Sequence, residues 1–310
     1  MVLKIFARLA KIFPVLFIVP FISCSNPVPA SQAPDTLGTR FYESLNLPNS
    51  LTFAGEKVPL EYYDVRENLD REMLSTAYFH SQTIRYIKNA PRYFAMVEPI
   101  LKKNGVPDDF KYLCVAESGF DPRAVSPARA VGLWQLVESA AKENGLEINS
   151  EIDERYNIEK STEAACRIFN SAYLKYGSWS LVAASYNGGR AFLDKQIANQ
   201  KNSNYYDLLF GEETTRYVFR ILALKLVMEN PLKYGFRIEK KDFYPIIETQ
   251  NVEISGPVLN FADFAIENGI TYKILKNFNP WLRETYLKNP GRKTYTLKIP
   301  EKDFRTKTNK

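Results

Sequence analysis

The chain has 310 residues, of which 14% are aromatic, and a formal net charge of +6. Much of this charge lies in the first eleven and the last ten residues, so the segment between them is close to neutral and shows no basic stripe that would suit a nucleic acid. One histidine and scattered cysteines give no metal-ligand spacing, and no pattern indicates an organic cofactor. The length allows one sizeable core and a smaller second unit.

Residues 1–23 have the pattern of a bacterial lipoprotein signal peptide. Basic residues precede an apolar run from Ile12 to Ile22, which is too short and too interrupted by proline to span a bilayer. The run ends at Ser23-Cys24, which resembles a lipobox, the sequence in which the cysteine becomes the lipidated N-terminus. The alternative is a plain secretory signal with an incidental cysteine.

A flexible tether is expected over residues 24–58, because its first part, Ser25–Pro34, is rich in Ser, Pro and Ala and has little to bury. Ser25, and not Asp, follows the cysteine, which by resemblance to sorted lipoproteins favours the outer membrane. The chain is thus expected on the periplasmic face of a bacterial membrane, held there by a lipid anchor at Cys24. The leaflet stays open.

Helices with polar outer faces are predicted over residues 59–105, for example Arg71–Ile87. This N-terminal helical extension carries aromatic residues that are expected to pack against the main domain. His80, the one histidine, has no partner pattern and is interpreted as structural.

An all-α domain of the size of a catalytic domain is predicted over residues 106–236, because helical periodicity continues without convincing strands. Ser161 and Ser178 are candidate N-caps for two of its helices. Cys114 and Cys166 fall on apolar helix faces, so both are expected to be buried free thiols. A disulfide between them is the alternative, which the sequence does not decide. The helices expected after the first one are Ser161–Tyr176, Trp179–Asn187 and Thr214–Glu229.

Glu117 is an ionisable residue on the apolar face of the first of these helices. Phe110, Leu113, Cys114 and Glu117 recur at helical spacing, and the helix is expected to stop at Gly119. Partial burial and the negative end of the helix dipole both raise the pKa of such a carboxyl group. A carboxylic acid that is protonated near neutral pH is what glycosidic cleavage requires of its general acid. The alternative is an ordinary glutamate that reaches solvent at a fraying helix end.

A small α+β module is predicted over residues 245–300, followed by a basic tail, residues 301–310. The expected order of its elements is β-α-α-β, and the second helix is expected to end at Asn279-Pro280. This order and this helix ending resemble those of a LysM module, a fold that binds N-acetylglucosamine-containing glycans. Whether this module retains glycan binding is open. Its expected strands and helices are Ile246–Glu248, Val252–Ile254, Phe261–Asn268, Tyr272–Asn277 and Thr294–Ile299.

Four segments in order carry a family resemblance: Glu117–Pro122, Ser126–Gln135, Asp153–Asn157 with Ser161-Thr162, and Ala184–Gly189. Together they resemble the lytic transglycosylases of the SLT, lysozyme-like superfamily and, within it, the membrane-bound lytic murein transglycosylase D type. The resemblance covers roughly residues 106–236, and the leader and the C-terminal module fit the same architecture. It implies a mainly α protein with a lysozyme-like all-α catalytic domain.

The resemblance also implies a substrate and a mechanism. Peptidoglycan glycan strands are the expected partner, and one glutamate, here Glu117, protonates the glycosidic oxygen between N-acetylmuramic acid and N-acetylglucosamine. The same residue then acts as base on the C6 hydroxyl, which closes a 1,6-anhydro ring. Because the nucleophile is internal, no second enzyme carboxylate is needed, unlike in paired-carboxylate glycosidases.

Further site residues are carried over by position. Ser118 is expected to support the geometry by hydrogen bonding, Trp134 and Gln135 to form a wall of the groove, and Tyr186 and Asn187 to face Glu117, with the tyrosine hydroxyl close to it. Trp134 and Tyr186 have core aromatics as the alternative. The run Asp153-Glu154-Arg155 is interpreted as a structural ion-pair and capping cluster.

The chain departs from the family pattern at three places. Arg129 stands where Gly is usual, Glu138 where Pro is usual and Ala140 where Thr is usual. Arg129 matters most, because a glycine there can relieve a strained backbone. Two other functions remain as alternatives: a hydrolase of the same fold, resembling goose-type lysozyme, and a non-catalytic peptidoglycan-binding lipoprotein.

Overall fold

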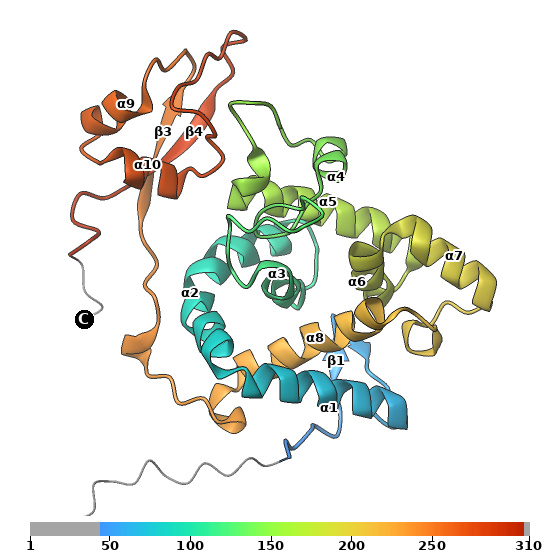
Figure 1. The fold of residues 1–310 in the computed structure, drawn as a ribbon. Helices are drawn as coiled ribbons and strands as arrows, with labels where there is room; N and C mark the ends of the chain where they lie inside the picture. The colour runs from blue at the N-terminus through green and yellow to red at the C-terminus, as the bar shows by residue number, and fades with distance from the viewer. Residues whose placement is uncertain (1–43, 307–310) are drawn as a thin grey trace, which may run out of the picture. The chain divides into compact units, whose positions relative to one another are not determined.

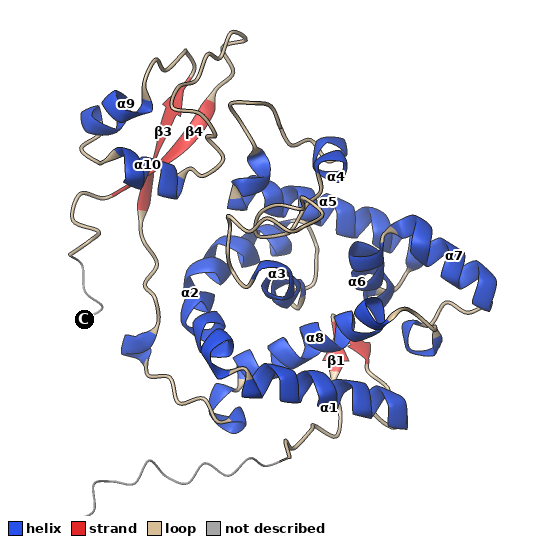
Figure 2. Ribbon diagram, viewed as in Figure 1, coloured by secondary structure: helices blue, strands red, loops and turns tan. Residues whose placement is uncertain are grey.

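The computed structural model describes residues 44–306, which are mostly helical and carry two small sheets (Figures 1 and 2). This confirms the mainly α fold class. The predicted signal peptide, Cys24 and the first part of the predicted tether lie outside the described residues, as does the end of the basic tail. Between residues 44 and 306, no helix is both long enough and apolar enough to cross a bilayer.

Helices α1 to α8 and a small hairpin form the larger, N-terminal part of the described chain. A continuous hydrophobic core from Leu51 to Phe236 holds them together. Their bounds are β1 Thr52–Phe53, β2 Glu56–Lys57, α1 Tyr63–Tyr78, α2 His80–Lys103, α3 Phe110–Ser118, α4 Glu138–Glu143, α5 Ile158–Tyr176, α6 Trp179–Gly188, α7 Arg190–Gln200 and α8 Glu212–Glu229. Short 3-10 turns add Glu154–Tyr156, Tyr205–Asp207, Pro231–Tyr234 and Lys240–Asp242.

The tether was predicted to reach residue 58, but residues 51–58 belong to the folded core. The hairpin β1–β2 packs into the core through Phe53 and Val58, both almost fully buried. Glu56 adds a polar anchor, because its carboxylate accepts hydrogen bonds from the backbone N–H groups of Trp179 and Ser180 at the start of α6. The prediction was wrong here because such a short hairpin leaves no periodic pattern in sequence.

The predicted helix Arg71–Ile87 is in fact two helices. The chain breaks at Phe79, whose ψ of 60° is not helical, and α1 ends there while α2 begins at His80. α1 lies along α8, and α2 contacts α5 and α3, so the extension shares the main core (Figure 1). The short α4 and the polar α7 were not predicted.

Helix caps explain where the central helices start and stop. Ser178 caps α6 as predicted, with its hydroxyl accepting from Leu181 N–H. The cap assigned to Ser161 was wrong: Asn157 caps α5, its side chain accepting from Lys160 N–H, and Ser161 lies inside the first turn. An asparagine at N-cap satisfies an otherwise unpaired N–H as well as serine does.

The C-terminal module is a β-α-α-β unit, as predicted. Strand β3 pairs antiparallel with β4, from Thr249 opposite Pro300 to Ile254 opposite Tyr295. Alternate β4 side chains are buried, which gives the small sheet one face against its helices. The predicted strand Ile246–Glu248 is a loop instead. The bounds are β3 Thr249–Ile254, α9 Phe261–Glu267, α10 Tyr272–Phe278 and β4 Tyr295–Pro300.

The Asn-Pro pair that ends the second module helix has a structural cause. Asn279 is fully buried, and its Nδ2 donates to the carbonyl oxygens of Leu275 and Lys298. Its Oδ1 accepts from Lys298 N–H at 2.8 Å. One amide therefore joins the end of α10 to β4, which no aliphatic residue could do.

Candidate active site

Glu117 lies in the last turn of α3, where Gly119 ends the helix in the left-handed conformation with φ of 60°. A Cβ on Gly119 would lie 2.6 Å from Cε1 of Tyr86, so a side chain here would also require the Tyr86 ring to move. Burial raises the pKa of Glu117 to about 7, with the hydrogen bond from Tyr217 and the charge of Arg220 opposing that rise. The carboxyl group is therefore part protonated at neutral pH.

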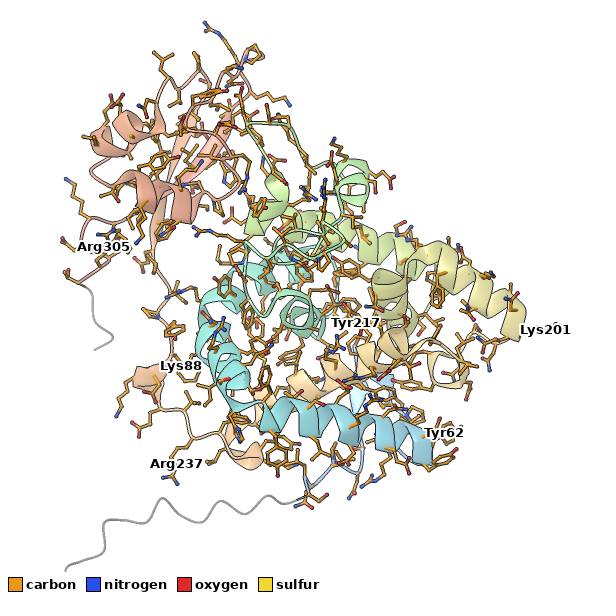
Figure 3. The ribbon with its side chains drawn as sticks, viewed as in Figure 1. Tyr62, Lys88, Lys201, Tyr217, Arg237 and Arg305 are labelled. Atoms are coloured by element: carbon orange, nitrogen blue, oxygen red, sulfur yellow. The ribbon has the colours of Figure 1, made fainter. Side chains whose placement is uncertain are left out.

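Tyr217 is the residue that sequence reasoning missed. It comes from α8 and is labelled in Figure 3, and its hydroxyl donates a hydrogen bond to Oε1 of Glu117. Tyr217 is 2% exposed, and burial together with the neighbouring carboxylate raises its pKa well above the ordinary value. It therefore stays a donor at any physiological pH. Tyr217 lies within the predicted helix Thr214–Glu229, but the sequence showed it only as one tyrosine among the apolar residues of that helix.

Tyr186 and Trp134 form a second pair beside Glu117. The Tyr186 hydroxyl donates to the backbone oxygen of Trp134 at 2.6 Å, and after burial the charge of Glu117 is the largest cause that raises the pKa of Tyr186. The Trp134 ring is fully buried, with Nε1 donating to Thr162 Oγ1 at 2.8 Å. This corrects the expectation that the ring forms a wall of the groove: it packs in the core against Phe169.

Asn187 and Ser118 each make a hydrogen bond near the end of a helix. Oδ1 of Asn187 accepts from Thr214 Oγ1 at 3.0 Å, which ties the end of α6 to the start of α8. Ser118 is half-buried next to Glu117, and its hydroxyl donates to Cys114 O within α3. Ser118 therefore bonds within α3, across its last turn. Three helices, α3, α6 and α8, thus carry Glu117, Tyr186 and Tyr217, respectively.

Gln135 lies on a tight loop, residues 129–136, hereafter called the substrate loop after the substrate contact that the sequence predicts for Gln135. Its φ of 49° is left-handed, and its Nε2 donates to the carbonyl oxygens of Gly132 and Ala124. Gly132 has φ of +82°, and a Cβ there would lie 2.1 Å from the backbone oxygen of Arg155. The loop thus rests directly on the backbone of the predicted ion-pair cluster.

The cluster Asp153-Glu154-Arg155 is structural, as interpreted from sequence. Arg155 bonds Asp153 through two nitrogens, at 3.0 and 2.7 Å, and both residues are buried. Glu154 pairs with Lys160 and accepts from Glu147 N–H. A bidentate arginine–carboxylate pair has a fixed orientation, so it can support the loop packed on it.

Charged residues from α1 and α8 form a network behind Glu117. Glu72 is 2% exposed and pairs with Arg216 at 2.5 Å, while Arg220 lies 3.8 Å from the second oxygen of Glu72. Arg220 also pairs with Glu213 at 3.0 Å. The charge of Arg220 favours ionised Glu117, and that of Glu213 disfavours it.

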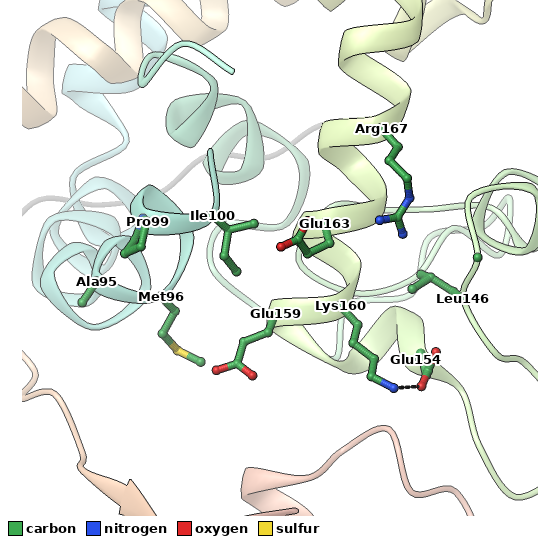
Figure 4. Close-up of a pocket in the computed structure, with 11 residues that line it drawn as sticks. Ala95, Met96, Pro99, Ile100, Leu146, Glu154, Glu159, Lys160, Glu163 and Arg167 are labelled. Carbon is green, nitrogen blue, oxygen red and sulfur yellow. Dashed lines mark hydrogen bonds and ion pairs between the residues drawn. The ribbon is translucent and has the colours of Figure 1, made fainter. Parts of the chain in front are cut away.

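Two cavities lie among the helices of this part of the chain. One, of about 280 Å³, lies among α1, α2, α3 and α8 and is lined by Gln82, Tyr86, Ala116 and Arg220. The other, of about 590 Å³, lies between α2 and α5 (Figure 4), and none of the predicted site residues lines it. None of the predicted site residues lines the smaller cavity either, although Ala116 directly precedes Glu117 in the chain.

Both remaining cysteines are free and buried, as expected for thiols on apolar helix faces. Burial raises the pKa of Cys114 and of Cys166 above the ordinary value, which keeps both thiols protonated.

Comparisons with known proteins identify two domains in this chain. The family model described as Transglycosylase SLT domain matches residues 95–209, and that described as Soluble lytic transglycosylase C-terminal LysM-like domain matches residues 250–303. The first match begins inside α2, earlier than the predicted boundary at residue 106.

Membrane-bound lytic murein transglycosylase D from two Escherichia coli strains is 31% identical over 232 residues, which is 73% of this chain and 50% of each relative. This chain therefore spans about half the length of the curated relatives it matches. A solved structure of an inactive mutant of the lytic transglycosylase Slt from Pseudomonas aeruginosa aligns over 58% of this chain and 35% of that chain, with 17% identity and a TM-score of 0.36. The family matches, together with the 31% identity, show that the chain carries a transglycosylase SLT domain followed by a LysM-like C-terminal domain of the soluble lytic transglycosylase type.

Proposed function

We propose that this protein is a lytic transglycosylase that cleaves the β-1,4 bond between N-acetylmuramic acid and N-acetylglucosamine in peptidoglycan and leaves a 1,6-anhydro end. The observation that carries the proposal is Glu117: its pKa of about 7 allows it to donate a proton and then to accept one at the same pH. The SLT and LysM-like domain matches and the name of the Escherichia coli relatives support the substrate.

In the first step, protonated Glu117 gives its proton to the glycosidic oxygen. The bond from C1 to that oxygen breaks, the electron pair goes to the leaving sugar, and positive charge develops at C1, where the 2-acetamido group of the substrate stabilises it. In the second step, ionised Glu117 takes the proton of the C6 hydroxyl while that oxygen bonds to C1. Glu117 ends protonated, and no water is consumed.

The neighbours of Glu117 suit both steps. The Tyr217 hydrogen bond stabilises the carboxylate that exists between the two proton transfers and fixes its orientation. The amide oxygen of Gln135 and the Nδ2 group of Asn187 are the polar atoms that we assign to sugar hydroxyl or acetamido groups. Ser118 contributes by holding the helix end that presents Glu117.

We also propose that a lipid at Cys24 anchors the protein to the periplasmic face of the outer membrane. Support comes from the lipobox-like sequence and from the Escherichia coli relatives, whose name describes them as membrane-bound. Labelling of cells with a fatty-acid analogue tests this, since Cys24→Ala is expected to abolish incorporation and release the protein from the membrane fraction.

Mass spectrometry of peptidoglycan digested by the chain that lacks residues 1–24 tests the reaction. We expect muropeptides that end in 1,6-anhydro-N-acetylmuramic acid, and none with Glu117→Gln, since an amide cannot transfer the proton. The exposed Glu267→Gln serves as the matched control and should keep full activity. Reducing ends would identify a hydrolase instead, and a folded protein that binds sacculi without cleaving them would identify a binding protein.

A further inference from the structure

The C-terminal module is joined to the SLT domain by backbone pairing, apart from the chain connection itself. Ile152 and Leu282 form an isolated antiparallel bridge. On either side of it, Asp153 N–H donates to Trp281 O at 2.9 Å and Arg283 N–H donates to Glu151 O at 2.8 Å. Segment 281–283 therefore acts as a short strand added to segment 151–153, which fixes the register of the two segments.

The two parts also share a hydrophobic core. Val131, Ile152 and Tyr156 belong to the SLT domain, yet they are buried in the same cluster as Trp281 and Leu282 of the module. Apolar side chains that are buried only while the two parts stay together oppose separation, because separation would return them to water. The interface between the module and the SLT domain is therefore packed like the interior of a single domain.

Polar contacts surround this shared core. Arg283 lies over the Tyr156 ring with Cζ 4.1 Å from the centroid, and Asn277 Oδ1 accepts from Arg123 at 2.6 Å. The Tyr295 hydroxyl donates to Glu147 at 3.1 Å. Within the module, Lys276 Nζ donates to the carbonyl oxygens of Leu282 and Glu284, so the docking segment is held in shape from its own side.

The docked segment leads directly to the substrate loop. Asp153, whose N–H bonds the module, holds Arg155 through two hydrogen bonds, and Arg155 Nη1 donates to the carbonyl oxygens of Arg129 and Leu136. Those two carbonyls are the first and last of the substrate loop. Val131, inside the loop, has its side chain in the shared core.

From the substrate loop the contacts continue to the site. The loop provides the Trp134 oxygen that accepts from Tyr186, and it carries Gln135. Continuous hydrogen bonds and packed side chains thus run from the module, through Asp153 and Arg155, to residues beside Glu117.

We propose that the C-terminal module is a positioning element of the active site: by docking on segment 151–156 it holds the substrate loop in the conformation that turnover requires. This inference rests on the proposed transglycosylase function. It differs from a role in glycan anchoring, because a module that only anchors glycan raises the local concentration of substrate and changes KM, whereas a module that shapes the loop changes kcat.

The test uses the chain from residue 25 onward with the double variant Asn277→Ala and Arg283→Ala. Both side chains are exposed and contact the SLT domain, so their removal weakens docking while leaving the module core intact. The matched control is Ile266→Ala with Lys273→Ala, two exposed module residues on α9 and α10. Each protein is assayed on a soluble tetrasaccharide of alternating N-acetylglucosamine and N-acetylmuramic acid, and on intact sacculi, with binding to sacculi and the melting temperature measured in parallel.

We expect kcat of the docking variant to fall roughly 2- to 30-fold on both substrates, which is the range of coupling through packed networks, with KM and sacculus binding unchanged. The control should behave as wild type, and Arg283→Lys, which keeps a cation over Tyr156, should recover part of the loss. Unchanged kcat would overturn the proposal, whether KM rises, as for an anchoring module, or stays the same. If the wild-type protein itself cleaves neither substrate, the proposed function is overturned, and this inference with it.

Discussion

The hydroxyl of Tyr217 on α8 donates a hydrogen bond to Glu117 on α3, although the two residues are 100 positions apart in sequence. This bond favours the ionised carboxylate, while burial favours the neutral acid, and the balance places the pKa of Glu117 at about 7. The pair therefore sets the pH range in which one carboxyl group can serve first as acid and then as base.

Tyr217→Phe should move this balance. Without the hydrogen bond the ionised form of Glu117 loses stabilisation, so its pKa rises and the alkaline limb of kcat/KM moves to higher pH. The rate at the optimum should fall by roughly tenfold, because a charge-assisted hydrogen bond that orients the acid is lost. The pH profile of muropeptide release measures both effects.

Tyr112→Phe is the matched control for that measurement. Tyr112 is also a buried tyrosine whose hydroxyl donates to a glutamate, Glu229, at 3.4 Å, and it lies on α3 as Glu117 does. Its removal should leave the pH profile in place. A profile that Tyr217→Phe leaves unmoved would mean that the bond does not control Glu117.

Glu117→Gln should stabilise the fold, but only where Glu117 would be ionised. Its pKa is about 7 in the folded chain and 4.5 as the ordinary value, so the native state disfavours the charge. Below pH 4.5 Glu117 is protonated in both the folded and the unfolded state, so it does not affect the free energy of unfolding. As the pH rises towards 7, Glu117 ionises in the unfolded state first, which lowers the free energy of unfolding, and this loss reaches its full size above pH 7. At pH 8 the variant should be about 3 kcal/mol more stable, and denaturant unfolding at pH 4 and pH 8 measures the difference. An equal gain at both pH values would contradict this account.

Local patterns allowed the position of Glu117 at the end of a helix to be predicted. The helical spacing that ends in Glu117, and Gly119 after it, follow from chain-local geometry, and the raised pKa of Glu117 follows from the same placement. The Tyr217 partner could not be predicted, because the contact joins distant segments. The burial of Trp134 is likewise a tertiary fact: sequence cannot separate an aromatic ring in a wall from one in a core.

The same distinction holds at the two ends of the described chain. The β-α-α-β order of the module was predicted, since hydrophobic periodicity and the Asn279-Pro280 pair mark it. Its docking on segment 151–153 was not, because backbone hydrogen bonds carry no side-chain signal. The burial of Phe53 was missed for a related reason: two-residue strands are too short for periodicity.

Gly132→Ala should disrupt the substrate loop. The residue has φ of +82°, and an added Cβ would lie 2.1 Å from the backbone oxygen of Arg155, so the loop must move away from its support. We expect a loss of at least about 2 kcal/mol in stability and a large loss of turnover.

Gly145→Ala is the control that separates the effect of backbone strain from the effect of the steric contact that Gly132→Ala makes with Arg155. Its φ of +81° is nearly the same, yet the nearest atom to an added Cβ is a side-chain nitrogen of Arg167 at 3.8 Å. It should lose about 1 kcal/mol from backbone strain alone and keep its turnover. Equal effects of the two substitutions on turnover would show that the contact with Arg155 is unimportant.

Arg129→Gly should stabilise the chain without loss of activity. Arg129 holds φ of 59°, which an L side chain rarely adopts, and its side chain is exposed. Its hydrogen bonds within the loop are made by the backbone: its N–H donates to Ser126 O, and its oxygen accepts from Arg155. Glycine keeps these bonds and removes the strain, although it adds freedom to the unfolded chain, so the net gain should be about 0.5–1 kcal/mol. Arg129→Ala, which keeps a Cβ, should give no gain, and denaturant unfolding of the three proteins compares them. A glycine variant less stable than the parent would mean that the arginine side chain, and not the backbone, supports the loop.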